Sequence, residues 1–569
     1  DGKSLLTALE MFSGCSSLTE VNLENLVGQD CYDMESMFAN CESMTKVTFR
    51  ALKSENLMTT SQMFTGCKAI VSIDLSAFDT TSVTDMDGIF ADSTNLKKVE
   101  FSEKFNTAKV QSMSGMFASC ENLESLDLKY FDTSSVTSMS FMFLECKNIK
   151  TINVKGFITK NVIDFGYMFS GCEKLNELID FNFNGDNAKY IYNMFENVKE
   201  LTSLTFTDFK TNEALRISSM FEGMKALEYI DISGMDLSGV EFLDSLFKND
   251  VKLKTIKGFD KEMKSLVGTD SMFENCTSLK EVDLRNFKTE NTKYMQKMFY
   301  NCESLEKLDV SELKGDAVED MNQMFENCKS LTSLDFHVFE TQNLNSFTTV
   351  FKGCEKLKVL KLPKLKTSSV NSYNELFAGC KSLETLEQNF ETSEGIGFSK
   401  VFYGCESLTT LDLSNWDVYN SNQFISTFEG CKNLKSLNIK NWQSKFAVQI
   451  QGMFKDCESL TDLKLSNFTT PITFDMSEMF SGCKSLTSLD LSTFETNFTR
   501  NMYRMFYNTL KLETLDLSHF VSQYLENSTE IFENIFEGKK NVTIIVDEDL
   551  FNVTYPENSE RIKPFHLLD

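Results

Sequence analysis

The chain repeats one pattern of apolar residues every 26 positions, from its beginning almost to its end. Cysteines mark this period over long stretches, and a phenylalanine stands three residues before each of these cysteines. The phenylalanine persists where the cysteine is replaced, as at Phe90, Phe221 and Phe247, and counting it gives 20 repeats. Self-similarity at a period of about 20 to 50 residues indicates a solenoid, in which each repeat contacts only its neighbours. The period therefore predicts the architecture of the whole chain.

Each repeat divides into two halves with different apolar spacing. Around Cys146 the first half has the three-and-four spacing of one helical face, with Val136, Met139, Met142, Phe143 and Cys146. The second half alternates like a short strand and has the leucine-rich form L-x-x-L-x-L-x-x-F, with Ile149, Ile152, Val154 and Phe157. We therefore expect an α/β repeat fold, a leucine-rich-repeat solenoid of about 20 units with one short strand and one short helix per 26-residue unit. Phe143 with Cys146, and Phe480 with Cys483, represent its predicted core ladder.

One string of residues carries a resemblance to a known family. The sequence M-F-x-G-C-x-S-L-T-x-L-D-L-S-x-F, at Met479 to Phe494, resembles the BspA-like leucine-rich repeats, in the 26-residue version of mycoplasma-type surface proteins. The resemblance extends over residues 1 to about 520. It implies a cell-surface or secreted protein that adheres to host proteins or to other cells.

The unbroken period predicts two regions rather than several globular domains. We expect the solenoid over residues 1–509 and a degenerate repeat that closes it over residues 510–569, where Ile531–Phe536 resembles the helical half and Val542–Val546 the strand. The chain begins in the helical half of a repeat, so we expect either that an N-terminal cap has been removed or that this end contacts another molecule. No apolar run approaches the roughly 18 residues of a membrane span.

The cysteines predict buried thiols rather than disulfides. Those in register form uninterrupted runs of three, three and nine, and pairing neighbours would leave one thiol over in each odd run. Apolar residues replace some of them, as expected if cysteine acts as a small buried hydrophobe. Cys31 lies out of register and is the candidate for a reactive or intermolecular thiol. No C-x-x-C spacing occurs and the chain has three histidines, so we expect no metal site and no cofactor.

The strand face is predicted to carry a column of carboxylates between the two inward residues of each strand. Its members are Asp74, Glu100, Asp127, Asp231, Asp283, Asp309, Asp335, Glu387, Asp412, Asp490 and Asp516. Such a column can attract a basic partner or hold calcium loosely. The alternative is that aspartate keeps an exposed strand soluble, beside serine and threonine.

The net charge of −27 excludes one class of function. A nucleic-acid-binding protein needs a basic stripe, whereas this chain has 56 basic and 83 acidic residues. Sequons for N-glycosylation are also predicted sites, and their total is close to chance. Five of the six follow residue 460, at Asn467, Asn497, Asn527, Asn541 and Asn552, and the sixth is at Asn275.

Two places interrupt the period. Cysteines are missing from Ile179 to about Val267, and one residue is lost between Cys380 and Cys405, where Gln388 takes a normally apolar strand position. Both interruptions are interpreted either as drift in a tolerant array or as a local change of curvature that shapes a partner site.

The sequence predicts a protein that is not an enzyme. No G-x-S-x-G, P-loop or H-E-x-x-H motif occurs, and a smooth solenoid face offers no obvious pocket. We expect an extracellular or cell-surface scaffold that binds protein partners of unknown identity through its acidic strand face. The alternative is a structural subunit of an extracellular filament or coat, self-associating through contacts between solenoids.

Overall fold

The computed structural model describes residues 5–24, 30–49, 56–211, 213–362, 365–521, 523–535, 543–546 and 562–564. The chain divides into two compact bodies. The N-terminal body comprises residues 1–282 and 286–288, and the C-terminal body comprises residues 283–285 and 289–569. Each body is built from short parallel strands that repeat along the chain, so the predicted solenoid is confirmed.

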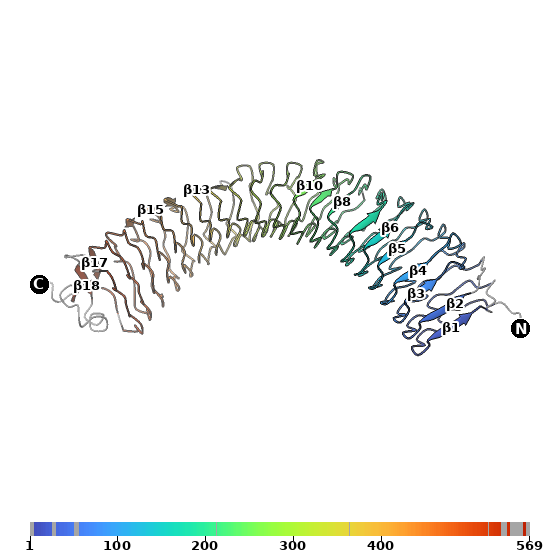
Figure 1. The fold of residues 1–569 in the computed structure, drawn as a ribbon. Helices are drawn as coiled ribbons and strands as arrows, with labels where there is room; N and C mark the ends of the chain where they lie inside the picture. Colours follow the sequence, from blue (N-terminus) through green and yellow to red (C-terminus); the bar gives the residue numbers. More distant parts are fainter. Residues whose placement is uncertain are drawn as a thin grey trace. The chain divides into compact units, whose positions relative to one another are not determined.

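Among the described residues, ten strands belong to the N-terminal body. They are β1 (Glu20–Leu23), β2 (Lys46–Phe49), β3 (Ser72–Asp74), β4 (Lys98–Glu100), β5 (Ser125–Asp127), β6 (Thr151–Asn153), β7 (Glu177–Ile179), β8 (Ser203–Thr205), β9 (Tyr229–Asp231) and β10 (Thr255–Lys257). They form the parallel sheets β1-β2, β3-β4, β5-β6-β7 and β8-β9-β10. Figure 1 shows β1 to β6 following one another along this body.

The part of the C-terminal body that the structure describes contains nine strands. They are β11 (Ser333–Asp335), β12 (Val359–Leu362), β13 (Thr385–Gln388), β14 (Thr410–Asp412), β15 (Ser436–Asn438), β16 (Asp462–Leu463), β17 (Thr514–Leu517), β18 (Thr543–Val546) and β19 (Ile562–Pro564). They form the parallel sheets β11-β12-β13, β14-β15-β16 and β17-β18-β19. The last sheet carries strand pairing beyond residue 509, and the boundary of a closing region at residue 510 stays a prediction.

The predicted helix in each repeat is wrong. Over the part of the chain that the structure describes, the first half of the repeat is a row of turns and no helix is present. In the repeat around Cys146, Phe141 and Glu145 have φ values of 59° and 56°, in the left-handed region. An α-helix of L-residues cannot continue through such residues. The equivalent positions of the other repeats also have positive φ, for example Tyr167 and Gly171.

The amide hydrogen bonds of this turn row explain its shape. Alternate amides donate to the following repeat, with Phe141 N to Gly166 O and Phe143 N to Met168 O both at 2.9 Å. The amides between them close turns within the repeat, as Leu144 N does to Phe141 O at 3.0 Å. A helix would instead direct every amide to the carbonyl four residues back in its own segment. The three-and-four spacing thus places apolar side chains inward without a helix.

Apolar side chains from the turn row stack in columns through the core. The rings of Phe117 and Phe143 lie 5.8 Å apart and those of Phe454 and Phe480 lie 5.7 Å apart, nearly parallel in both pairs. The ladder cysteine beside each ring donates its thiol to the phenylalanine carbonyl of the preceding repeat, as Cys146 Sγ does to Phe117 O at 3.1 Å. Phe143, Cys146, Phe480 and Cys483 are all fully buried.

The sixteen cysteines all lie in the described part of the chain, and no disulfide joins any two of them there. Burial raises the pKa of Cys67 and Cys146 to about 12, so these thiols stay protonated at neutral pH. Cys31, the predicted reactive thiol, is fully buried and donates to Asp33 O at 3.4 Å, and burial raises its pKa as well. That prediction is wrong, because a reactive thiol needs access to solvent. Cys15 is the exposed one.

Asp250 interrupts the cysteine column with a carboxyl group. Its side chain is fully buried, and Oδ1 accepts a hydrogen bond from Met224 N at 2.7 Å. No described atom hydrogen-bonds Oδ2. Burial, helped by the nearby Glu222, raises the pKa of Asp250 well above its ordinary value. Ser93, at the same position of another repeat, instead donates to Phe64 O at 2.8 Å as the cysteines do.

The raised pKa of Asp250 predicts a pH-dependent stability. The stabilisation associated with the protonated carboxyl is fully present below the unfolded pKa of about 4 and is lost as pH rises through the folded pKa. We expect Asp250→Cys to stabilise the protein at pH 8 by about 2 kcal/mol, because it replaces a buried acid by a neutral thiol. Thermal denaturation of both proteins should show a higher melting temperature for the variant at pH 8 and a smaller difference at pH 4.

Ser93→Cys is the matched control, since Ser93 is neutral and already hydrogen-bonded in the same column. Its effect on melting should be small and the same at both pH values. An Asp250→Cys effect of equal size at pH 4 and pH 8 would contradict the proposed role of the buried carboxyl.

Burial of the ladder also predicts how the thiols react. In the folded protein at pH 7.5 a thiol reagent such as dithionitrobenzoate should modify Cys15 rapidly and the other fifteen cysteines slowly, because they are buried. Cys15→Ser should remove the rapid phase, whereas Cys31→Ser should leave it intact. Rapid modification of Cys31, followed by mass spectrometry of peptides, would show that its burial is wrong.

Candidate functional site

The strand face presents the outward residues of successive strands. In β3, β5 and β14 the middle residue is buried and the residues on either side are exposed. Eight members of the predicted acidic column end or nearly end strands: Asp74, Glu100, Asp127, Asp231, Asp335, Glu387, Asp412 and Asp516. Asp283, Asp309 and Asp490 occupy the equivalent position outside the strands. The column is therefore accessible along both bodies.

Carboxylates rarely face each other across adjacent strands. Asp74 lies opposite Glu100, but Asp127 lies opposite Asn153, and Lys361 lies between Asp335 and Glu387. The Lys361 Nζ atom is 3.3 Å from an Asp335 carboxylate oxygen. Asparagine and lysine thus interrupt the column at these places, whereas Asp283, Asp309 and Asp335 follow one another in three consecutive repeats.

The nine aspartates of the column share one contact. Each accepts a hydrogen bond at Oδ1 from the backbone amide two residues later, which turns the chain where the strand ends. The amide donors are Ser76, Lys129, Ser233, Arg285, Ser311, His337, Ser414, Ser492 and Ser518, at 2.8 to 3.2 Å. Hydrogen bonds from the following serine hold the pKa of Asp74, Asp309 and Asp412 below its ordinary value. These three carboxylates remain charged at neutral pH, and all nine have a local structural role.

The two glutamates of the column have no such role. Glu100 forms an ion pair with Lys98 in the same strand. Glu387 is exposed and has no ion pair or side-chain hydrogen bond to the described residues. Its carboxylate is therefore available to a binding partner.

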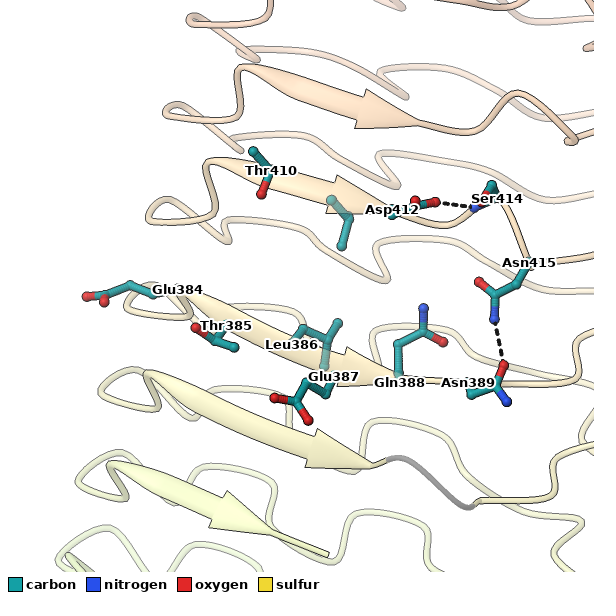
Figure 2. A pocket seen from close by; sticks show the side chains of 11 residues that line it. Glu384, Thr385, Leu386, Glu387, Gln388, Asn389, Thr410, Asp412, Ser414 and Asn415 are labelled. Carbon is teal, nitrogen blue, oxygen red and sulfur yellow. Dashed lines mark hydrogen bonds between the residues drawn. The ribbon is translucent and has the colours of Figure 1, made fainter. Parts of the chain in front are cut away.

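A hollow interrupts the strand face beside Glu387. It lies between β13 and β14, which belong to different sheets, in the repeat that is one residue shorter than the others. We call it the strand-face hollow; its volume is about 740 Å³. It is lined by Glu384, Thr385, Leu386, Glu387, Gln388, Asn389, Thr410, Leu411, Asp412, Ser414 and Asn415. Figure 2 shows these side chains on the two strands and on the segments that follow them.

Gln388 links the strand-face hollow to the core. Its Oε1 atom accepts hydrogen bonds from the indole Nε1 of Trp416 at 2.9 Å and from Phe390 N at 3.1 Å. Trp416 is buried, so its N–H needs an acceptor that an apolar residue at position 388 could not supply. Beyond it, Asn415 Nδ2 donates to Asn389 Oδ1 at 3.3 Å, which joins the two repeats at the end of the hollow (Figure 2).

Two smaller hollows adjoin the strand-face hollow on the same face. One is lined by Glu384, Ser407, Thr409, Asn433 and Lys435, and the other includes Ser414, Asn415, Tyr419 and Asn467. The combined surface carries carboxylates, amides and hydroxyls. It can hydrogen-bond an extended polar segment and attract positive charge to Glu384, Glu387 and Asp412.

Other predicted sites lie apart from this surface or at its end. Asn467 is exposed and donates its Nδ2 to Lys440 O at 2.6 Å, and Asn497 is exposed. Asn527 is half-buried and accepts a hydrogen bond from Thr529 N. Asn541 and Asn552 lie outside the described residues. Within the described ranges no group of three or more histidine, cysteine, aspartate or glutamate residues could hold a metal ion.

The sequence carried a signal for the strand-face hollow that was incomplete. The sequence shows both the lost residue and Gln388, but neither indicates on which face of the solenoid a hollow forms. Trp416, whose N–H accounts for Gln388, was not singled out. The described residues contain no helix that could span a membrane.

Solved structures similar to this chain are leucine-rich-repeat proteins. A leucine-rich repeat protein from Bacteroides ovatus is 15% identical over 95% of this chain and 87% of that chain, with a TM-score of 0.27. One from Eubacterium ventriosum is 15% identical over 68% of this chain and 83% of that chain, with a TM-score of 0.26. The structure of the TLR13–ssRNA13 complex is 16% identical over 99% and 90% of the two chains, with a TM-score of 0.24. No curated protein matches the chain.

A family model described as "Mycoplasma protein of unknown function, DUF285" matches the chain six times. The matches extend over residues 6–125, 97–207, 181–279, 251–360, 345–461 and 422–544, and so overlap along almost its full length. The narrower resemblance to BspA-like repeats stays a prediction. The chain belongs to the DUF285 family of mycoplasma-type repeats.

Proposed function

We propose that this protein is an extracellular or cell-surface scaffold, without catalytic activity, that binds a basic segment of a protein partner along its strand face. The observation that carries the proposal is the strand-face hollow, where three carboxylates line an opening of about 740 Å³ between β13 and β14. The predicted likeness to BspA-like surface repeats supports the location and the adhesive role.

The geometry favours an extended segment with lysine or arginine side chains. Glu387 has no partner of its own among the described residues, and Glu384 forms only a long ion pair of 4.0 Å with Lys358. Asp412 Oδ1 accepts from Ser414 N in its turn and from Asn438 Nδ2 at 3.0 Å, so Oδ2 is the oxygen that a ligand would meet. A cationic side chain in the hollow would meet these carboxylates, while Asn389 and Asn415 at its end offer amides to a peptide backbone.

The net charge of −27 adds a long-range contribution. A uniformly acidic protein attracts basic segments over about a Debye length and raises their rate of association. The hollow would then select where the segment docks. The same charge makes the strand face a poor surface for self-association, so this face does not support the alternative role as a filament subunit.

Substitution at the hollow tests the proposal. The variant Glu384→Gln, Glu387→Gln, Asp412→Asn removes three charges while asparagine preserves the turn, as Asn153 does with Lys155 N at 3.0 Å. We expect the affinity for a fluorescein-labelled peptide of alternating lysine and serine to fall about tenfold, since each partly exposed ion pair contributes about 0.5 kcal/mol. Fluorescence anisotropy at low ionic strength measures this affinity.

The matched control removes charge from a regular part of the column. Asp74→Asn with Glu100→Gln lies on the paired strands β3 and β4, whose residues do not line the strand-face hollow. This variant should retain most of the affinity. Equal losses in both variants would leave only non-specific attraction to a negative surface and would contradict a site at the hollow.

A further inference from the structure

The C-terminal body exposes a row of large apolar side chains in the segment that precedes the turn row of each repeat. Its members are Ile396, Tyr419, Phe446, Phe474, Phe498 and Tyr524, which are 42 to 52% exposed and come from successive repeats. We call this surface the edge patch. At about 150 to 250 Å² for a large side chain, these six expose on the order of 600 Å². Apolar patches of more than a few hundred Å² mark interaction sites.

Bulky and small residues alternate in the edge patch. One column, eight residues before the stacked phenylalanine of each repeat, contains Asn420, Phe446, Ile472 and Phe498 in order. A second column, six residues before it, contains Asn422, Val448, Phe474 and Arg500. The large ring thus moves from one column to the other between neighbouring repeats, which makes projections and gaps at the spacing of the repeats.

One gap is a defined groove. It has a volume of about 440 Å³ and lies over Asn420 and Asn422, between Ile396 on one side and Phe446 and Val448 on the other. Glu394 stands at its rim. Phe498, which is 49% exposed, lies three repeats further along the same column as Asn420. The groove can accommodate an aromatic ring with apolar contacts on two sides.

We propose that the edge patch pairs with the same patch of a second copy of this chain, with the two copies antiparallel about a two-fold axis. An axis midway between Asn420 and Phe498 places Phe498 of each copy in the groove of the other. The same axis sets Phe446 against Ile472 and Val448 against Phe474, so apolar side chains meet across the centre. Such an interface is self-complementary, as a closed dimer requires.

The polar residues of the edge patch agree with this pairing. Arg500 of one copy lies opposite Asn422 of the other and beside its Glu394, while Glu394 lies opposite the hydroxyl of Tyr524. Glu526 already pairs with Arg500 of its own chain at 3.4 Å. No two like charges of these columns are opposed, which matters for a chain of net charge −27. With its polar rim the patch approaches the roughly 800 Å² per partner that stable dimers bury.

Sedimentation velocity of the full chain tests this proposal. With protein made in bacteria at 0.5 to 50 µM, we expect a concentration-dependent equilibrium between monomer and dimer. Phe498→Ser should raise the dissociation constant at least about tenfold, and it keeps the sequon at Asn497 intact. Tyr130→Ser, which removes a similarly exposed ring (44%) from the N-terminal body, should leave the equilibrium unchanged.

A cross-link tests the geometry separately. Asn422→Cys with Arg500→Cys puts two thiols opposite each other in the dimer but three repeats apart within one chain, so mild oxidation should yield a covalent dimer of closed form. A monomer at every concentration, a dimer indifferent to Phe498→Ser, or open-ended polymers would each overturn the proposal. Far-ultraviolet circular dichroism and melting of Phe498→Ser show whether it has folded.

Discussion

The structure depends on backbone amides that find their acceptors in the next repeat. In the turn row, Phe141 and Phe143 both donate to residues 25 positions further on, and only the amides between them are satisfied within the repeat. A single repeat would expose these donors and its stacked phenylalanine to water, at a cost that it could not recover. The stability of the fold therefore comes from contacts between repeats, and a substitution in one repeat affects both adjacent repeats. Asp250 is costly because it places a carboxyl group in a buried column whose other members are neutral, most of them cysteines.

The solenoid could be predicted from the sequence because its period arises from equivalent residues that pack on each other in adjacent repeats. The sequence did not predict the turn row, because Val136, Met139, Met142 and Phe143 have the spacing of a helical face. That spacing records only which side chains point inward, and a row of turns satisfies it equally well. The residue two positions after the stacked phenylalanine is often glycine or asparagine, as at Gly171 and Asn197, and this recurrence could have predicted turns in place of a helix. Both tolerate the left-handed conformation, and their recurrence at one position is incompatible with an uninterrupted helix.

The strand-face hollow was predictable only in part. The missing residue between Cys380 and Cys405 shows that one repeat must deviate, but a deletion can be absorbed on any side of a solenoid. The outcome depends on Trp416, whose buried N–H is matched by Gln388 at the end of β13. This match requires two residues 28 positions apart to meet across repeats. Their approach follows from packing, which periodicity does not describe.

The aspartates of the acidic column stabilise the fold through Oδ1, and Oδ2 can contact a partner. Each aspartate accepts a hydrogen bond at Oδ1 from the amide two residues later, so the turn accounts for the residue type without its charge. Asparagine does the same at Asn153 and Asn438, which accept from the amides of Lys155 and Lys440. Since the neutral residue suffices for the turn, the charge of the nine aspartates has a separate physical effect, which is a negative potential along the whole face. Glu387 does not accept a turn hydrogen bond, and it lies beside the strand-face hollow between β13 and β14. Its substitution therefore distinguishes binding at the hollow from general attraction to the acidic face.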